Sequence, residues 1–359
     1  MPSELGTTAP ASDRYDVEAV RGLVARLFVD GGMADEMAGD VTECLLMADM
    51  MGHSTHGLAI APWYLEEIRR GGMNLKGSYE VRSDRGACVA WNGRRLPGAW
   101  LINRAIDLAM ERIADHGVVT LTIAGGHHTG ALATYLPRLT ERGLMVQLAC
   151  SGPASGGVAP FGGTRGIFTP NPLSAGIPSR QDPILLDISC SITTIKRSVQ
   201  LAEAGRRYPG AWALDAEGNP SDDPRVLMSG NGSLMPVGGL DHGHKGYALA
   251  LLVEALTQGL SGVGRRDGLT GIAMNTFLQV IDPGAFGGTD AFLDETTWLI
   301  GACHANPPRS GLDAVRVPGD RARARVAEAL KTGVLLDPFI VAALEPHVHR
   351  IGETFPPSI

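Results

Sequence analysis

The chain has 359 residues, of which 44% are hydrophobic, and this length predicts about two domains in a globular protein. The formal net charge of −7, without any Lys/Arg cluster interleaved with aromatic residues, argues against a nucleic-acid partner, and no apolar run is long enough to cross a membrane. The five cysteines are odd in number and form no CxxC pair, which favours reduced thiols in a cytoplasmic protein.

The first third of the chain is predicted to be mainly helical, after a polar tail at 1–15 that we expect to be disordered. Apolar residues recur at the spacing of amphipathic helices, which predicts helices at 17–28, 33–51, 63–72 and 99–117. Between the last two helices, residues 79–93 have the pattern of two short strands joined by a turn.

The middle of the chain is rich in predicted strands. Apolar stretches bounded by glycine or proline predict strands at 118–126, 143–152, 170–179, 183–189 and 271–283. The helical pattern then recurs, which predicts a buried helix and two helices near the end of the chain, at 246–262, 318–333 and 337–351.

This order of elements predicts an α/β protein with a discontinuous domain. Residues 16–124 plus 312–359 are expected to form a mainly helical domain built from both chain ends. Residues 125–311 are expected to form a sheet domain that is inserted into it.

Two common site fingerprints are missing. No G-x-G-x-x-G follows a strand and opens a helix, and the nearest stretch, "TIAGGHHTGAL", has the wrong spacing, so an ordinary Rossmann phosphate loop is not expected. The histidine pairs lack HExxH or any adjacent ligand set of known pattern, and we therefore expect no metal site.

The stretch "GHSTHG" at 52–57 follows one predicted helix and precedes another. A histidine beside hydroxyl groups that orient its ring can transfer a proton near neutral pH. The same residues are also consistent with a capping loop, with Ser54 or Thr55 at the start of the next helical segment. Residue types in this stretch leave both interpretations open.

Three further stretches place glycine beside histidine or a basic residue: "GGHHTG" at 125–130, "DHGHKGYAL" at 241–249 and "RVPGDRARAR" at 316–325. Backbone N–H groups at a helix start, or a nearby lysine, can bind a phosphate group. Each stretch also has an alternative interpretation: a glycine turn at 125–130, an exposed helix cap at 241–249 and a solvated basic face at 316–325.

Taken together, seven stretches resemble the type-2 malate/L-lactate dehydrogenase family, which is unrelated to the Rossmann lactate dehydrogenases. The family includes ureidoglycolate and sulfolactate dehydrogenases, diketogulonate reductase and piperideine/pyrroline-carboxylate reductase. The stretches occur in the family's order and cover about residues 17–335. They are "ADMMGHSTHGLAIAPWYLEEIRRGGMN", "GGHHTGALATY", "VAPFGGTRGIFTPNPLSAGIP", "PILLDIS", "YPGAWALDAEGNPSDDP", "GGLDHGHKGYALALLVEALTQGLSG" and "RVPGDRARAR".

The resemblance implies an oxidoreductase that uses NAD or NADP, with a family-specific, non-Rossmann cofactor-binding sheet domain. It also implies a homodimer, with the active site near the subunit interface and the helical domain contributing to substrate binding and dimerisation. A small-molecule substrate is implied, with hydride transfer to or from the carbon of a C=O or C=N group. Protonation of the heteroatom by a positioned histidine suits this chemistry.

Residue roles follow by position from the same resemblance. His56 matches the family's proton donor, Thr55 stands where a serine usually supports that histidine, and His128 matches a second active-site histidine beside the cofactor. Tyr64 matches a tyrosine of the substrate pocket. The matched cofactor contacts, besides His128, are Asp187, His244, Lys245, Pro318, Gly319 and Asp320.

The sequence departs from the family pattern on the expected substrate side. The family arginine that clamps a substrate carboxylate is replaced by Ile60, which cannot make a bidentate contact. Arg197 stands where imine-reducing members have an aspartate. Another cation is needed for an acidic substrate, and the candidates are Lys196, Arg197 and Arg69.

Two functions are compatible with these observations. The first is a dehydrogenase or reductase of a 2-oxo acid, a 2-hydroxy acid, a cyclic imine or a related metabolite. The second is a repurposed family member that binds a nucleotide or small ligand without turnover, which the loss of the arginine at Ile60 would permit. The presence of His56, His128 and Lys245 favours the enzyme.

Overall fold

The structure is a computed structural model that describes residues 13–228 and 231–359. Its largest sheet has seven strands in the order β2-β3-β4-β11-β5-β6-β7, and every neighbouring pair is antiparallel except β3 and β4. The strands are β2 (Glu80–Asp84), β3 (Cys88–Asn92), β4 (Val118–Gly126), β5 (Met145–Ser151), β6 (Leu173–Ile177), β7 (Ile184–Ile188) and β11 (Met274–Ile281). The predicted mixture of helices and strands around a central sheet is confirmed.

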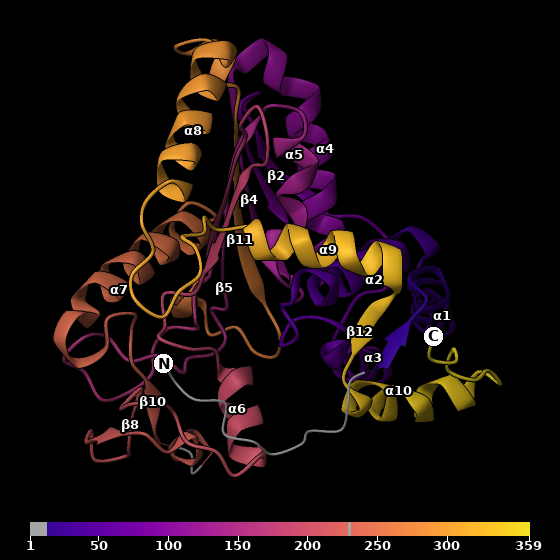
Figure 1. Ribbon diagram of the computed structural model, residues 1–359. Helices are drawn as coiled ribbons and strands as arrows, with labels where there is room; N and C mark the ends of the chain where they lie inside the picture. Colours follow the sequence, from indigo (N-terminus) through magenta and orange to yellow (C-terminus); the bar gives the residue numbers. More distant parts are fainter. Residues whose placement is uncertain (1–12, 229–230) are drawn as a thin grey trace.

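Helices lie on both sides of this sheet (Figure 1). Helix α4 (Gly98–His116) packs against β4 and β11, and the short α5 (Pro137–Thr140) packs against β5 and β6. On the other side lie α7 (Gly239–Glu254), which continues into a π-helical turn, and α8 (Thr289–His304). The apolar stripe of α4 accounts for its position, because it buries Leu101, Ile102 and Ile106 at the sheet.

The two ends of the chain lie together. Strand β1 (Asp13–Tyr15) pairs with β12 (Val334–Leu336), and helices from the beginning and end of the chain contact one another. These helices are α1 (Val17–Asp30), α2 (Asp35–Met51), α3 (Ala61–Arg69), α9 (Asp320–Thr332) and α10 (Pro338–Arg350). Their buried side chains share one hydrophobic core with the α4 side of the sheet.

The seven-stranded sheet is not confined to residues 125–311, which were expected to form the sheet domain. Strands β2 and β3, and most of β4, precede residue 125, so residues assigned to the helical domain contribute to the central sheet. Residues 1–12 of the expected disordered tail lie outside the described residues, whereas 13–15 form β1.

A second, smaller core lies on the α7 side of the sheet, where Phe277 of β11 packs with Ala250 and Val253 of α7. This core also contains Ala149 of β5, Val158 and Phe168 from the segment between β5 and β6, and side chains from the segment between β7 and α7. The latter segment forms much of this body. It contains α6 (Ile195–Glu203) and a small sheet of β8 (Ala213–Leu214), β9 (Pro220–Ser221) and β10 (Ser233–Leu234). No helix in the two described ranges is long and apolar enough to cross a membrane.

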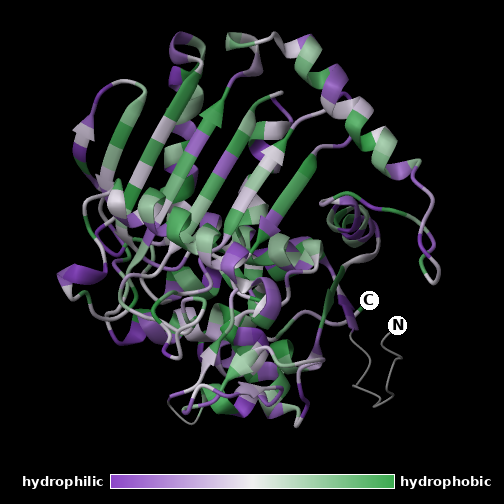
Figure 2. Cartoon of the chain, turned by 90° about the vertical axis from the view of Figure 1, so that its left-hand side faces the viewer, coloured by the Kyte–Doolittle hydropathy of each residue, from purple (hydrophilic) through white to green (hydrophobic). Residues whose placement is uncertain are grey.

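Part of the α7-side face of the sheet is left uncovered. One row of half-buried side chains crosses five adjacent strands in register: Thr120, Gln279, Gln147, Ala175 and Leu186. Figure 2 looks at the molecule from this side and shows these strands beside α8, with hydrophobic and hydrophilic residues mixed along them. Large apolar side chains on the flanking helices are exposed as well, including Leu251, Leu252, Trp298 and Leu299.

Two helix starts differ from the sequence prediction. Helix α7 begins at Gly239, after Gly238 adopts a positive φ of 98°, so the predicted start at 246 was too late and His244 and Lys245 lie inside the helix. After β4, residues 127–131 are irregular and lead only to a 3-10 turn and the short α5, because Pro137 cannot continue a helical hydrogen-bond ladder.

Candidate active site

A cavity of about 600 Å³ lies where the loop between α2 and α3 meets the segment after β4, the end of β7 and the start of α6. Three histidines, one aspartate and one lysine contribute polar groups to its wall, and several apolar side chains complete it. The lining residues include His53, Thr55, His56, Trp63, His128, Thr129, Leu132, Cys150, Asp187, Thr194, Ile195, Lys196, Val199, Ile272 and Met274. A volume of this size is typical of a small-molecule site.

The loop that carries His56 is held by Asp49. Gly52 ends α2 with a positive φ of 88°, and the chain then turns so that one carboxylate oxygen of Asp49 accepts a hydrogen bond of 2.6 Å from the Leu58 backbone N–H. Gly57 is required at the contact, because a Cβ there would lie 2.2 Å from an Asp49 oxygen. Burial raises the pKa of Asp49 to about 7.

His56 is oriented by its neighbour. Its Nδ1 lies 2.9 Å from the Thr55 hydroxyl oxygen, and Nε2 has no partner among residues 13–228 and 231–359. Burial lowers the pKa of His56, the charge of Asp187 opposes this shift, and His53 adds to it. The unliganded ring is therefore neutral at pH 7, with one nitrogen available to exchange a proton with a ligand.

His128 is fixed from behind by Tyr64. The Tyr64 hydroxyl lies 2.7 Å from His128 Nδ1, and the Gly130 backbone N–H donates to the same nitrogen at 3.3 Å. Because Nδ1 accepts from Gly130, the proton of the neutral ring is assigned to Nε2. Burial, with His56 and His127 nearby, lowers the pKa of His128 to about 3, so the ring is a neutral donor in this site.

A buried pair lies behind this histidine. His127 is 0% exposed and its Nε2 lies 3.5 Å from a carboxylate oxygen of Glu67, which is 2% exposed on α3. Burial lowers the pKa of His127 to about 4. The start of α4 packs against the same backbone, since a Cβ on Gly98 would lie 2.5 Å from the His127 carbonyl oxygen and 2.6 Å from that of His128.

Asp187 lies at the end of β7, where the first cavity meets a second one of about 860 Å³. One carboxylate oxygen accepts from the Ser174 hydroxyl at 2.7 Å, and the other accepts from the Ala133 backbone N–H at 2.9 Å. His53 and Asp187 line both cavities, so the two spaces are adjacent.

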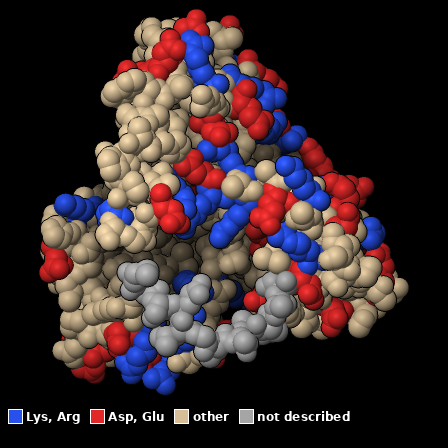
Figure 3. Space-filling model, in the orientation of Figure 1, with Lys and Arg blue, Asp and Glu red and all other residues tan. Residues whose placement is uncertain are grey.

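The second cavity has a basic wall. Its lining includes Pro318 and Gly319, which precede α9, and four arginines: Arg309, Arg316, Arg321 and Arg325. Arg325 packs over Gly52, where a Cβ would lie 1.8 Å from a guanidinium nitrogen. Figure 3 shows charged side chains of both signs over α9, beside a hollow in the surface. Asp320 does not line this cavity, and its carboxylate forms ion pairs with His304 and with Arg323, each with an N···O distance of 2.8 Å.

Several residues that the family pattern matched lie away from the two cavities. His244 and Lys245 are exposed on α7 and do not line either cavity. Tyr64 is buried behind His128, and Ile60 is 6% exposed and belongs to the main hydrophobic core. Arg197 is exposed, although its neighbour Lys196 does line the first cavity.

Sequence reasoning missed Asp49 and Glu67. Both sit within predicted amphipathic helices, where an acidic residue normally faces solvent. The signal that was present is weak: Asp49 precedes the helix-ending Gly52 and lies near the glycine-flanked histidine loop. No sequence signal predicts that α3 packs so that Glu67 meets His127.

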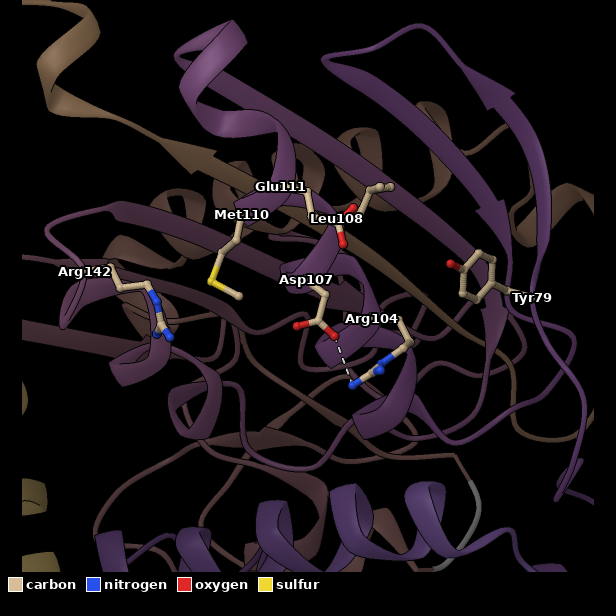
Figure 4. A pocket seen from close by; sticks show the side chains of 7 residues that line it. All are labelled: Tyr79, Arg104, Asp107, Leu108, Met110, Glu111 and Arg142. Carbon is tan, nitrogen blue, oxygen red and sulfur yellow. Dashed lines mark ion pairs between the residues drawn. The ribbon is translucent and has the colours of Figure 1, made fainter.

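Another depression in the surface has a different character (Figure 4). It has a volume of about 550 Å³ and is lined by Tyr79, Arg104, Asp107, Leu108, Met110, Glu111 and Arg142. Arg104 pairs with Asp107 at 3.0 Å and with Glu36 at 2.6 Å, so its charge is already matched.

Neither here nor elsewhere in the described ranges do three His, Cys, Asp or Glu residues gather as a metal site would require.

Comparison with known proteins identifies the family. Residues 15–345 match the family described as malate/L-lactate dehydrogenase. The chain belongs to this family. The resemblance found in the sequence is therefore confirmed, and the chain is an oxidoreductase by family.

Individual relatives share most or part of the chain. An L-lactate dehydrogenase of Cupriavidus necator is 31% identical over 96% of this chain and 99% of its own length. A (2R)-3-sulfolactate dehydrogenase (NADP(+)) of Chromohalobacter salexigens is 35% identical over 61% of this chain and 63% of its own. The crystal structure of Δ1-piperideine-2-carboxylate reductase from Pseudomonas syringae superposes with a TM-score of 0.80, at 26% identity, over 94% of this chain and 99% of that one.

Proposed function

We propose that this chain uses NAD or NADP to transfer a hydride to or from the C=O or C=N carbon of a small organic acid. The substrate class comprises 2-oxo and 2-hydroxy acids, cyclic imino acids and related metabolites. The names of the relatives, which include hydroxy-acid dehydrogenases and an imine reductase, support a nicotinamide cofactor and a substrate of this kind.

One geometric relationship carries the proposal. His56 and His128 reach the same cavity from two different segments, with ring planes 11° apart and centroids 5.9 Å apart. Each ring has its Nδ1 engaged, His56 by Thr55 and His128 by Tyr64, which leaves both Nε2 atoms for a ligand. Two oriented imidazoles in a cavity of this size suit a reaction at a polar double bond.

In this mechanism the bound cofactor supplies or accepts the hydride. His56 handles the proton. In the reducing direction the imidazolium form of His56 gives its Nε2 proton to the carbonyl oxygen or imine nitrogen and becomes neutral, while Nδ1 keeps its hydrogen bond with the Thr55 hydroxyl. In the oxidising direction the neutral His56 takes the hydroxyl or amine proton. His128, as a neutral Nε2–H donor, orients the substrate or the nicotinamide amide without changing its own charge.

The two adjacent cavities fit a dinucleotide. The first has polar and apolar walls beside the histidines, and the second has four arginines that could neutralise phosphate groups. Asp187, at the junction, and Pro318 and Gly319, before α9, are the residues that would contact the cofactor between them. His244 and Lys245 would contact only a cofactor that extends past both cavities onto α7.

We further propose that the chain forms a homodimer through the uncovered sheet face and its flanking helices. Trp298 on α8 is 67% exposed, and Leu251 and Leu252 on α7 are exposed beside the uncovered strands. Large exposed apolar side chains beside a partly covered sheet are typical of an interface between subunits.

The activity is tested by following the absorbance of reduced nicotinamide with NADH and with NADPH, against a panel of 2-oxo acids and cyclic imino acids. Substrate-dependent oxidation of either cofactor supports the proposal. Tight cofactor binding by calorimetry, without turnover of any panel member, supports instead a repurposed member that binds a nucleotide or small ligand.

A further inference from the structure

An acidic substrate needs a positive group in the cavity. Ile60, which stands where the family pattern has an arginine, cannot supply one. Ile60 is 6% exposed, packs in the main core and does not line the cavity. An anion brought into a partly desolvated site without a cation would bind poorly, because its lost hydration would not be compensated. A different residue of this chain must therefore hold the charge.

Two of the three cations that the sequence offers are placed elsewhere. Arg69 is exposed on α3 and forms a bidentate pair with Glu66, with distances of 2.9 and 2.7 Å. Arg197 is exposed, and its guanidinium reaches Gln200 at 3.4 Å on the same helix. Neither side chain lines the cavity that contains His56.

Lys196 is placed differently. It lines the same cavity as His56 and His128, and no other lysine or arginine of the described ranges does so. Within those ranges it has neither an ion pair nor a side-chain hydrogen bond, so its ammonium group is available. The arginines nearby line the adjoining cavity, where the cofactor phosphates are proposed to bind.

The local structure directs this charge towards the cavity. Thr194 caps α6 by accepting a hydrogen bond of 3.1 Å from the Arg197 N–H, and Lys196 is the second residue of the helix. Thr194, Ile195 and Lys196 together form one side of the wall, so the first turn of α6 faces the ligand space. The positive end of the helix dipole lies at the same place and adds to the attraction for an anion.

We propose that Lys196 binds the anionic group of the substrate and replaces the arginine that is absent at position 60. This inference rests on the proposed oxidoreductase function. Ile195, Val199, Ile272 and Met274 line the cavity as well, and they offer an apolar surface to a substrate side chain. The substrate class is therefore a 2-oxo acid, or the matching imino or hydroxy acid, with an apolar side chain.

The test compares Lys196→Ala, Lys196→Arg and the neighbouring control Arg197→Ala. Phenylpyruvate serves as the substrate and oxamate as a non-reacting probe, whose dissociation constant is measured by calorimetry with reduced cofactor present. Loss of one charge-assisted hydrogen bond should raise the phenylpyruvate KM and the oxamate Kd of Lys196→Ala by about tenfold or more. The cofactor KM should stay unchanged, Lys196→Arg should recover most of the affinity, and Arg197→Ala should resemble the unmodified protein.

Three results would overturn the inference: an increase confined to the cofactor KM, an equal effect of Arg197→Ala, or no change in Lys196→Ala. Failure of oxamate to bind the unmodified protein would overturn it too. Failure of the proposed function is distinguishable, because oxamate binding that depends on Lys196 supports the anion site even when no compound is reduced. Circular dichroism spectra that match the unmodified protein show that each variant is folded.

Discussion

Tyr64 and His128 are joined by a hydrogen bond of 2.7 Å between the phenol oxygen and Nδ1, made behind the cavity rather than inside it. Tyr64 is 2% exposed and lies among the aromatic rings of Trp63 and His127. The bond therefore acts on a ligand only through His128, whose free nitrogen it directs towards the cavity. Tyr64 is a positioning residue in this account.

Tyr64→Phe should lower kcat about fivefold to tenfold while lowering the free energy of unfolding by only about 1 kcal/mol, the usual contribution of one hydrogen bond. KM for the cofactor should stay unchanged. Tyr79→Phe is the matched control, because Tyr79 stacks on Trp91 outside the cavity. A loss of stability without any change in kcat would restrict Tyr64 to a structural role.

The pH dependence of the reaction should follow His56. Since burial lowers its pKa below the ordinary value of 6.5, kcat/KM for reduction should rise as the pH falls through a value below 6.5, where the imidazolium forms. The oxidation rate should change in the opposite sense, because it needs the neutral ring. Stopped-flow measurements in both directions check this, and an inflection for reduction well above 6.5 would disagree with it.

Stability should depend on pH through Asp49. The pKa of its carboxyl is raised to about 7 in the folded chain from 3.8, so folded molecules hold a proton that unfolded ones have released. The free energy of unfolding attributable to Asp49 therefore falls as the pH rises from about 4 to 7, by about 4 kcal/mol in total.

Asp49→Asn should remove this dependence, because the amide oxygen can still accept from the Leu58 N–H without a titrating proton. Urea unfolding at a series of pH values should show that the free energy of unfolding of the variant increases relative to that of the unmodified protein as the pH approaches 7. Asp49→Ala, which loses the hydrogen bond, should be less stable at every pH. A constant difference between Asp49→Asn and the unmodified protein across this range would contradict the assignment.

Trp298→Glu should convert the proposed dimer into monomers, because it places a charge in the apolar surface of α8. Sedimentation velocity at several protein concentrations measures the change. Leu330→Glu, on α9 and similarly exposed at 63%, is the control and should leave the assembly unchanged. If the unmodified protein sediments as a monomer, the proposed dimer interface is wrong.

Much of the architecture could be predicted because local pattern decides it. The helices near 17–28, 33–51 and 99–117 follow from apolar periodicity, and in the structure each of them ends at a glycine, Gly31, Gly52 and Gly117 respectively. The sequence did not predict which segments form the central sheet, because β4 pairs with β11, which is far from it in the sequence. Periodicity carries no information on such long-range pairing.

The site was predictable to a different degree. The glycine-flanked histidines His56 and His128 were identified from residue type and family position, and the structure brings them to one cavity. Asp49 and Glu67 were not identified, because their burial depends on how loops and helices pack. Ile60 was predicted to be unable to bind a carboxylate because its side chain is aliphatic, whereas its place in the core was not predicted.

The central claim is that His56 transfers the proton. The most direct measurement is kcat for reduction by His56→Ala, with cofactor affinity titrated separately and His349→Ala, at an exposed position of α10 that lines neither cavity, as the control. Loss of a general acid should reduce kcat about 10²–10⁴-fold in His56→Ala and leave the cofactor Kd within about twofold, whereas His349→Ala should keep most of the activity. A kcat for His56→Ala within about tenfold of the unmodified protein would contradict the account.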